Sequence, residues 1–523
     1  MSEQISNNKQ TNNRQIAKNA MALYFRMIVM MLIGLYTSRV ILNALGVTDY
    51  GIYNVVGGFV SMFSLVSSSL VSSVSRSLTF ELGTGNKEKL KRTFSTSIYV
   101  LLGLSLILIL LLEVVGVWYL NNKMVIPADR LYAANWCFQL SVITFVLGLI
   151  NAPYSASIIS HERMDVYAYF TIMDAIFKLV ICYAVIHSPI DKLIMYGILL
   201  CFIHVVNQII YVVFCKHHFE ECRFKWIFDK TLFKSLFSFA GWNFIGCSAA
   251  VLRTQGATLL LNWAGGPVVN AANGVANSIC NIVNNFVSNF TQAFNPQITK
   301  RYAAQEYESL MNLLIYGSKF SYFLLLLLVL PIAFNAKFIL ELWLGIVPEH
   351  TVSFVRLIIV FMLAEAVSRP IITAKNATGE IRNYQIVVGG ILLLMLPLSY
   401  IGIKMGLPVE IVPFCNAATA CLAVFARMYM LRGDFPCWSS RVFVTKVLLN
   451  VSFVTIVSAI LPFFTYWHLE YGWHNFIITS VLSVICTCIS ILYIGCNEQE
   501  RLMIMSKTKG MVISVYKKLI RKA

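Results

Sequence analysis

The sequence predicts an all-α polytopic membrane protein with about 14 transmembrane helices. Of the 523 residues, 58% are hydrophobic and only 12% are charged, about half the charged share of a soluble domain. Apolar runs of about 20 residues recur from Ala20 to Cys496 with short polar breaks. Runs of that length can cross a bilayer only as helices, because a helix satisfies its backbone hydrogen bonds internally.

The expected spans follow these apolar runs in order, and every connecting loop is short. The longest outer loop, near residues 335–350, leaves no room for a folded external domain. We therefore expect the activity to lie within the bilayer. The spans are 20–45, 51–75, 94–119, 131–155, 166–187, 193–214, 236–262, 269–294, 311–334, 351–373, 384–403, 409–430, 442–466 and 474–496.

Lys and Arg predict the orientation of these spans, because positive charge near span ends stays cytoplasmic. With the amino terminus inside, the outer segments hold few basic residues, and an even number of spans returns the basic tail to the cytoplasm. That tail, KTKGMVISVYKKLIRKA, can lie on anionic lipid, which accounts for much of the net charge of +17 without any nucleic acid. The first span is expected to be an uncleaved anchor, with no signal peptide. The outer basic residues are Lys123, Arg130, Lys192, Lys337 and Lys404.

The thirteen cysteines show no paired zinc spacing and are expected to act as small apolar residues. His217 and His218 between Cys215 and Cys222 leave a metal site as an alternative. A phosphate-binding loop of the GxxxxGK[ST] type is not found in the sequence. We therefore expect no metal and no cofactor, with coupling to H⁺ or Na⁺ left open.

An internal repeat divides the chain into halves. ILNALGVTDYGIYNVVGGF at the end of the first span resembles LLNWAGGPVVNAANGVANS at the end of the seventh, so that Asn43 matches Asn262 and Gly46 matches Gly265. A second similarity pairs SHERMDVYAYF with ATGEIRNYQIV and aligns Glu162 with Glu380. Six spans separate each pair, and because six is even, the halves have the same orientation in the membrane.

We therefore predict two six-helix lobes related by a pseudo-two-fold axis along the membrane normal, followed by two appended helices. The predicted segments are a cytoplasmic arm at 1–19, an N-terminal lobe at 20–214, a basic linker at 215–235, a C-terminal lobe at 236–430, appended helices at 442–496 and a basic cytoplasmic tail at 497–523.

Two polar stripes occupy corresponding helices of the halves. At about 100° per residue, the members of each stripe fall on one side of their helix. Polar groups facing hydrocarbon are costly, so they line a wet cavity or hydrogen-bond between helices. Both readings stay open for the serines, whereas the number of amides favours a cavity. The first stripe is Ser61, Ser64, Ser68, Ser72 and Ser75, and the second is Asn270, Asn273, Asn277, Asn281, Asn284, Ser288, Gln292 and Asn295.

Ionisable residues within spans are candidates for function. Asp174 with Lys178, and Glu365 with Arg369, are spaced to neutralise each other on one helix face. Each pair is either a structural ion pair or a site that exchanges partners or protons during coupling or gating.

Three arginines in the first helices of the halves have no acid three or four positions away, namely Arg26, Arg39 and Arg253. The planar guanidinium fork favours phosphate, so these residues suggest a cavity for an anion. For Arg26 the alternative is that it reaches the inner membrane interface.

The chain resembles the polysaccharide transporter branch of the multidrug/oligosaccharidyl-lipid/polysaccharide superfamily, and its Wzx-type flippases in particular. The resemblance lies in the fourteen-span, two-lobed plan, in LGVTDYGIYNVV after span one, in FILELWLG after span nine and in ATGEIRNY before span eleven. It covers nearly the whole chain with loose motifs.

The resemblance implies a substrate, an oligosaccharide on undecaprenyl diphosphate that moves across the bacterial inner membrane for O-antigen, capsule or exopolysaccharide synthesis. It implies diphosphate binding by Arg26, Arg39 and Arg253, and sugar binding by the stripe residues. It also implies membrane lipid, a polysaccharide polymerase and chain-length machinery as partners. The sugar-binding set is Ser61, Ser64, Ser68, Ser72, Asn273, Asn277, Asn281, Asn284 and Ser288.

Two other functions remain as rivals. A drug and cation antiporter of the same fold would need exposed acids in its cavity, yet spans one, two, seven and eight contain arginine and neither Asp nor Glu. A membrane enzyme such as a polymerase or ligase would need a large outer loop and a nucleophile with its base, and neither is found in the sequence. We therefore expect a transporter and not an enzyme.

Overall fold

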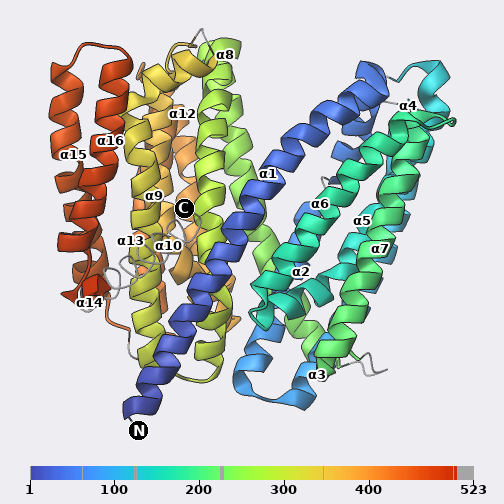
Figure 1. Cartoon of the computed structure of the whole chain (residues 1–523), viewed down its shortest axis with the longest axis horizontal. Helices are drawn as coiled ribbons and strands as arrows, with labels where there is room; N and C mark the ends of the chain where they lie inside the picture. Colours follow the sequence, from blue (N-terminus) through green and yellow to red (C-terminus); the bar gives the residue numbers. More distant parts are fainter. Residues whose placement is uncertain are drawn as a thin grey trace, which may run out of the picture. The chain divides into compact units, whose positions relative to one another are not determined.

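All the regular elements in the described residues are helices (Figure 1). The computed structural model describes residues 2–61, 63–122, 124, 126–223, 229–344, 347–436, 438–498 and 500–502. The α-helices are α1 (Ser2–Ser61), α2 (Ser64–Thr84), α3 (Lys87–Leu111), α4 (Val117–Asn122), α5 (Leu131–Ser160), α6 (Met164–Ile186), α7 (Lys192–His218), α8 (Lys230–Ala303), α9 (Tyr307–Leu344), α10 (Thr351–Thr378), α11 (Arg382–Leu393), α12 (Met395–Lys404), α13 (Ile411–Leu431), α14 (Ser440–Phe443), α15 (Asn450–His468) and α16 (Trp473–Ser490).

Short 3₁₀ and π segments interrupt or extend these helices. The π segments make α3 continuous with α4 and α14 continuous with α15, and extend α16 to Gly495. Each therefore lengthens a membrane helix rather than ending it. The segments are Leu112–Gly116, Val444–Leu449 and Ile491–Gly495 in π form, and Ala128–Arg130 and Glu220–Cys222 in 3₁₀ form.

Eleven helices in the described residues are long and apolar enough to cross a membrane, and each overlaps one predicted span. They confirm the prediction of a multi-pass helical membrane protein. They are Lys87–Asn122, Ala128–Ser160, Met164–Ile186, Lys192–His218, Lys230–Gly266, Tyr307–Leu344, Thr351–Thr378, Arg382–Lys404, Ile411–Leu431, Ser440–His468 and Trp473–Gly495.

The remaining predicted spans fall in α1, α2 and the second part of α8. The first has an apolar stretch, Met21–Gly34, that is shorter than the others. The second and eighth carry the serine and asparagine stripes, and this polarity separates them from the apolar spans. Their helical structure confirms that the stripes lie along helices.

The halves of the repeat bend at the same place. α1 changes direction at Gly46, with φ 80° and ψ 170°, and α8 does so at Gly266, with φ 68° and ψ −163°. An L side chain rarely adopts this conformation, so glycine is required at both bends. The match of Gly46 to Gly265 is therefore wrong by one residue, and the register agrees with the 220-residue spacing of the polar stripes.

The second similarity also corresponds to repeated structure. α5 ends at Ser160 and α6 begins at Met164, while α10 ends at Thr378 and α11 begins at Arg382. The helix end and the next helix start are the same distance apart in sequence at both boundaries, and this matches the alignment of Glu162 with Glu380. The repeat is therefore a feature of the backbone as well as of the sequence.

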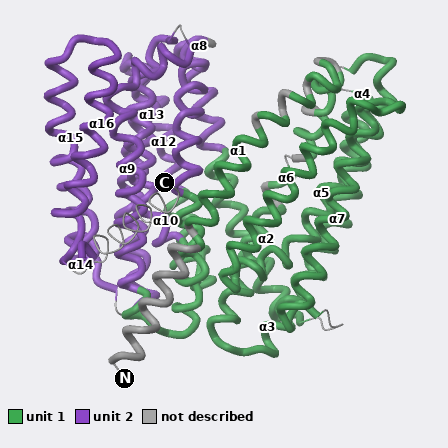
Figure 2. Tube along the Cα trace, viewed as in Figure 1, with its two compact units in different colours: residues 1–251, 288–310, 373–389 green, residues 252–287, 311–372, 390–523 purple. Residues whose placement is uncertain are grey.

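The described chain forms two compact units (Figure 2). Unit 1 comprises residues 1–251, 288–310 and 373–389, and unit 2 comprises 252–287, 311–372 and 390–523. The unit boundaries fall inside α8, α9, α10 and α11, whereas the lobes predicted from the repeat divide the chain between spans. The lobe assignment remains a prediction.

Several predicted segments lie partly or wholly outside the described residues. α1 begins at Ser2, so the backbone of the predicted arm is helical over residues 2–19. Residues 224–228 of the basic linker and 503–523 of the basic tail are outside the described residues, as are the side chains of Arg39 and Ser61.

Each unit has its own apolar core. In unit 1, Val74 and Leu78 of α2 belong to one buried cluster with Phe94 of α3 and Ile158 of α5. In unit 2, the buried cluster joins α8, α9, α10 and α13. In both units a polar-striped helix also contributes apolar residues to the core, for example Val74 in unit 1.

An ionic cluster joins three helix ends at the predicted outer side of unit 1. The Arg130 guanidinium donates through Nε to Asp49 Oδ1 at 2.7 Å and through Nη1 to Asp191 Oδ2 at 2.6 Å. Asp191 also caps α7, accepting from the backbone N–H of Leu193 and Ile194. Burial alone would raise the pKa of Asp191, but its bonds to Arg130 and to the α7 N–H groups bring that pKa below its usual value.

We expect Asp191→Asn to lower stability at neutral pH by at most about 1 kcal/mol, the range of exposed ion pairs. Asn caps a helix as well as Asp, so the variant removes the charge and keeps the cap. Because the folded pKa lies below the usual 3.8, the contribution is present above that pH and is lost as the pH falls through the folded value. Thermal unfolding between pH 7 and pH 3 should show the two proteins converging in acid; a constant difference would contradict this assignment.

Candidate functional site

Three guanidinium groups lie near one carboxylate in unit 2. Arg253 comes from the first part of α8, Glu365 and Arg369 come from α10, and Arg427 comes from α13. The α10 residues follow each other by one helical turn, so they lie on one face. The cluster thus has more positive than negative charge.

Hydrogen bonds fix the positions of these groups. Arg427 donates through Nη1 to Glu365 Oε1 at 2.8 Å, with only 4% of the Arg427 side chain exposed. Arg369 donates to Asn284 Oδ1 on the second part of α8. Glu365 acts electrostatically on both Arg253 and Arg369. The Glu365 carboxylate therefore accepts a hydrogen bond from Arg427 and also interacts electrostatically with Arg253 and Arg369.

Arg253 has the least complete set of partners in this cluster. Its Nη1 donates to Asn416 Oδ1 at a long 3.3 Å, and its guanidinium lies 4.6 Å from the centre of the Phe361 ring. Its Nε is buried with no hydrogen-bond partner among the described residues. A buried donor without an acceptor is costly, so this group is suited to an added anion.

Arg26 shows the same feature in unit 1. It donates through Nη2 to Asn289 Oδ1 at 3.0 Å and lies 5.0 Å from the Tyr167 ring centre, and its Nε is buried with no partner among the described residues. These contacts hold the partly buried Arg26 against α6 and α8, and its role at an anion site remains a prediction. Arg26 and Arg253 belong to different units, and the side chain of Arg39 lies outside the described residues.

Residues of the asparagine stripe lie in different surroundings, some at a pocket or beside Arg369 in unit 2 and others in unit 1. Asn273 and Asn277 line an open pocket of about 500 Å³ in unit 2. Asn281 is exposed and Asn284 accepts from Arg369. Ser288 falls in unit 1, where it is half-buried and its carbonyl accepts from the Thr291 hydroxyl.

The serine stripe lies beside a second pocket, of about 570 Å³, inside unit 1. Ser64 and Ser68 line it together with Thr144 of α5 and His204 of α7, although most of its surface is apolar. Ser72 is half-buried and is not among the residues lining this pocket. Part of the stripe therefore faces a cavity, and part of it packs.

Asp174 and Lys178 form the ion pair that their spacing predicts, at 2.7 Å. Asp174 also accepts from Asn207 Nδ2 of α7 at 2.5 Å. The carboxylate is thus neutralised and held in position between α6 and α7. Its role in coupling remains a prediction.

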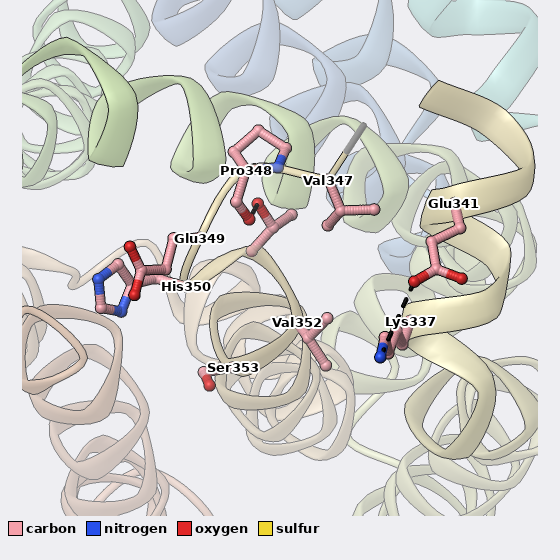
Figure 3. A pocket seen from close by; sticks show the side chains of 9 residues that line it. Lys337, Glu341, Val347, Pro348, Glu349, His350, Val352 and Ser353 are labelled. Carbon is pink, nitrogen blue, oxygen red and sulfur yellow. Dashed lines mark hydrogen bonds and ion pairs between the residues drawn. The ribbon is translucent and has the colours of Figure 1, made fainter. Parts of the chain in front are cut away.

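A third pocket, of about 450 Å³, lies where α9 leads to α10 (Figure 3). Lys337 and Glu341 face each other at 3.9 Å, and His350 Nδ1 lies 2.6 Å from Glu410 Oε1. Glu341 also accepts from the Tyr471 hydroxyl. These charges are partnered within the protein, so this pocket is a poorer candidate than the arginine cluster.

The described residues contain no group of three or more His, Cys, Asp or Glu side chains placed to hold a metal. His218 stacks on Phe214, and the Cys215 thiol lies 3.5 Å from the Tyr154 carbonyl. Both side chains therefore have contacts within the protein.

Sequence reasoning missed Arg427 and Asn416. Arg427 lies near the end of span twelve, where a basic residue normally marks the inner interface. Its acid, Glu365, is distant in sequence, so no local spacing rule could pair them. The only available signal was that an arginine lay within an otherwise apolar run.

The fold agrees with that of known transporters. A MATE transporter of the MOP superfamily in an outward-facing conformation superposes with a TM-score of 0.69 at 13% identity, covering 81% of this chain and 96% of that one. A MATE protein in its bent conformation gives 0.67 at 14% identity, with 81% and 95% covered. A MOP superfamily transporter from Pyrococcus furiosus, described by the reverse polarity of its binding pocket, gives 0.67 at 13% identity, with 81% and 96% covered.

Sequence comparison identifies the family. No curated protein matches the chain significantly. A family model described as polysaccharide biosynthesis protein matches residues 16–302, more than half of the chain. The chain therefore belongs to this polysaccharide biosynthesis family and has the fold of MOP superfamily transporters.

Proposed function

We propose that the protein is a flippase that moves an undecaprenyl-diphosphate-linked oligosaccharide across the bacterial inner membrane by alternating access. The repeat unit belongs to an O-antigen, a capsule or an exopolysaccharide. Both termini are cytoplasmic in this proposal, and a polymerase with its chain-length machinery uses the product. Membership of a polysaccharide biosynthesis family supports the substrate class.

The single observation that carries the proposal is the buried Nε donor of Arg253, which has no partner among the described residues. Arg369 and Arg427 lie in the same cluster, with Glu365 as the nearby acid. An anionic diphosphate would supply the missing acceptors and balance the charge. Charge-assisted bonds to phosphate are among the stronger hydrogen bonds, so one site can hold a headgroup whose lipid tail stays in the bilayer.

The membrane potential can drive the proposed direction. A cell that is negative inside favours outward movement of negative charge by about 2.3 kcal/mol per charge per 100 mV. Arg26 supports the proposal as a second anion contact, since its Nε is also buried without a partner among the described residues. We further propose Asp174 and Glu365 as positions where H⁺ or Na⁺ exchange would couple to transport.

The rival function is a drug and cation antiporter, because one similar structure is described as a multidrug resistance transporter. A cation site needs available carboxylates. Asp174 is bound to Lys178, Glu365 to Arg427, and Glu162 to Lys300. In the structure these three acids are paired with basic side chains, so they are poorly placed to bind a cationic drug, which supports an anionic substrate.

We expect Arg253→Ala to reduce transport about tenfold to a hundredfold, because one charge-assisted bond contributes about 1.5–3 kcal/mol. Arg253→Lys should recover only part of it, since Lys lacks the planar fork. The measurement is the transfer of a fluorescent undecaprenyl-diphosphate oligosaccharide between leaflets of proteoliposomes. Arg92→Ala is the matched control, because Arg92 is half exposed and forms a surface ion pair with Glu88 one turn earlier.

The same variants should be compared in the host after deletion of the gene. A flippase predicts accumulation of undecaprenyl-linked repeat units, measured by mass spectrometry, with loss of surface polysaccharide. Neither should be corrected by stably expressed Arg253→Ala. Unchanged polysaccharide with altered sensitivity to cationic drugs would sink the proposal and favour the antiporter.

A further inference from the structure

An open pocket of about 500 Å³ lies between the two parts of α8, on either side of the bend at Gly266. Thr258 and Asn262 line it from the first part, and five residues line it from the second. All of its lining belongs to unit 2. Its volume falls within the range of about 300–1,000 Å³ that is usual for small-molecule sites. The residues from the second part are Asn270, Ala271, Asn273, Gly274 and Asn277.

The bend creates this pocket. A continuous helix would carry Asn262 and the second-part residues along one rod, with no concave side. The positive φ of Gly266 turns the helix, so that side chains of both parts border one hollow. Because this conformation favours glycine, Gly266 is a structural requirement of the pocket.

The lining is rich in carboxamides and holds no charged side chain among the described residues. Asn277 Nδ2 donates to the Asn273 carbonyl at 2.9 Å and to its Oδ1 at 3.0 Å, which orders both side chains. The Oδ1 of Asn270 is buried with no hydrogen-bond partner among the described residues. Because Asn270 lines the pocket, a rotation of its carboxamide would bring this unpartnered acceptor to a ligand hydroxyl or N–H.

The lining of the pocket indicates which chemical groups a ligand would need. A carboxamide offers both donors and acceptors, which matches neighbouring hydroxyl or acetamido groups. A carboxylate or phosphate would lose its hydration here with no cation in the lining to replace it. The arginine cluster, in contrast, suits the anion. Arg253 lies nine residues before Asn262 on the same part of α8, roughly 13 Å along the helix at about 1.5 Å per residue.

We propose that this pocket is a subsite for an uncharged sugar ring, placed on the same helix as the anion site at Arg253. This inference rests on the proposed function and adds to it that Thr258, Asn262 and Asn270 determine specificity for a neutral sugar. It predicts a preference for repeat units whose contacting sugar is neutral over those with a uronic acid at that position.

The first test is direct binding to the purified full-length protein in nanodiscs. The probes are chitobiose, a neutral disaccharide, and a uronic-acid-containing disaccharide of similar size, compared by saturation-transfer difference NMR. Chitobiose should bind and the acidic probe should bind at least about tenfold more weakly. Asn270→Leu should weaken chitobiose binding about tenfold, because it removes the unpartnered acceptor.

Asn262→Ala provides a second variant, since this side chain is exposed and its loss disturbs the fold least. The matched control is Asn122→Ala, whose exposed carboxamide donates only to the Trp118 carbonyl of its own helix. Equal binding of both probes, or unchanged chitobiose binding in both pocket variants, would overturn the subsite.

Transport separates this inference from the proposed function. Proteoliposomes should be given undecaprenyl diphosphate carrying either the neutral or the acidic disaccharide. If the wild type moves both and Asn270→Leu leaves their ratio unchanged, the subsite is wrong and the flippase stands. If neither lipid moves while chitobiose still binds, the proposed function fails and the pocket remains a sugar site.

Discussion

Replacing Lys319 by Met should destabilise the protein by about 3–5 kcal/mol, the loss typical of breaking a buried ion pair. Lys319 of α9 lies 2.8 Å and 3.2 Å from the two carboxylate oxygens of Glu500, which follows α16. The side chains are only 4% and 10% exposed. Without the ammonium group, the Glu500 carboxylate would keep the bond from the Asn497 N–H but would lose its basic partner at a site where its side chain is only 10% exposed.

A double variant separates the ion pair from packing. Lys319→Met with Glu500→Gln removes both charges, so it should regain much of the loss of the single variant. Lys446→Met is the control, because Lys446 is exposed at the start of the same appended hairpin. Thermal unfolding of the purified full chain measures the effect, and a double variant as unstable as the single one would contradict the ion-pair explanation.

A local measurement can accompany the global one. Cys496 lies next to this pair and is 7% exposed. Burial raises the pKa of its thiol, so both access and ionisation limit its reaction with a thiol reagent. Peptide mapping should show faster labelling of Cys496 in Lys319→Met than in the wild type, with slow labelling restored in the double variant.

The spans of the fold could be predicted from sequence because hydropathy over a bilayer length is a local property. Each apolar helix falls on a predicted span, for example Thr351–Thr378 on 351–373. The repeat matched Gly46 to Gly265, whereas the bend corresponding to Gly46 lies at Gly266, because two adjacent glycines are equivalent in sequence and only the backbone angle distinguishes them. The unit boundaries inside α8 and α10 come from packing between distant segments, which no local pattern reports.

In the candidate site, only contacts between residues close in sequence could be predicted. The spacing rule found Asp174 with Lys178, since these lie one turn apart. It could not find Asn207 as a further partner of Asp174, nor Arg427 as the partner of Glu365, because tertiary folding brings those groups together. The arginines without a nearby acid were selected by local spacing alone, and the contacts of Arg26 and Arg253 depend on helices far away in the chain.

Arg76 should be the second position of large effect, since Arg76→Ala is expected to cost about 3 kcal/mol. Arg76 of α2 donates through Nε to the Asn376 carbonyl at 3.0 Å and through Nη2 to the Ala377 carbonyl at 2.8 Å. These carbonyls belong to the last turn of α10, where the regular helical ladder ends and the Asn376 carbonyl also accepts the Gly379 N–H at 3.1 Å. Within unit 1, one guanidinium therefore caps a helix distant in sequence.

Gly379 provides an independent way to disturb the same cap. Its φ is 82°, which an L residue adopts at a cost of about 1–2 kcal/mol. A Cβ at this position would lie 2.6 Å from Arg76 Nη2 and 3.0 Å from its Cζ. Gly379→Ala must therefore displace the guanidinium from the carbonyls in addition to straining the backbone.

The two changes should be less than additive. Part of the effect of Gly379→Ala passes through Arg76, so in an Arg76→Ala background it should shrink to the cost of the backbone strain alone. Thermal midpoints of the four proteins test this, with Arg76→Lys as a control that keeps the charge and loses the two-donor fork. Additive shifts would mean that the sites act separately. Since Gly379 and Ala377 belong to ATGEIRNY, coupling would give that motif a structural reason: a helix end shaped to receive an arginine from the other half of the repeat.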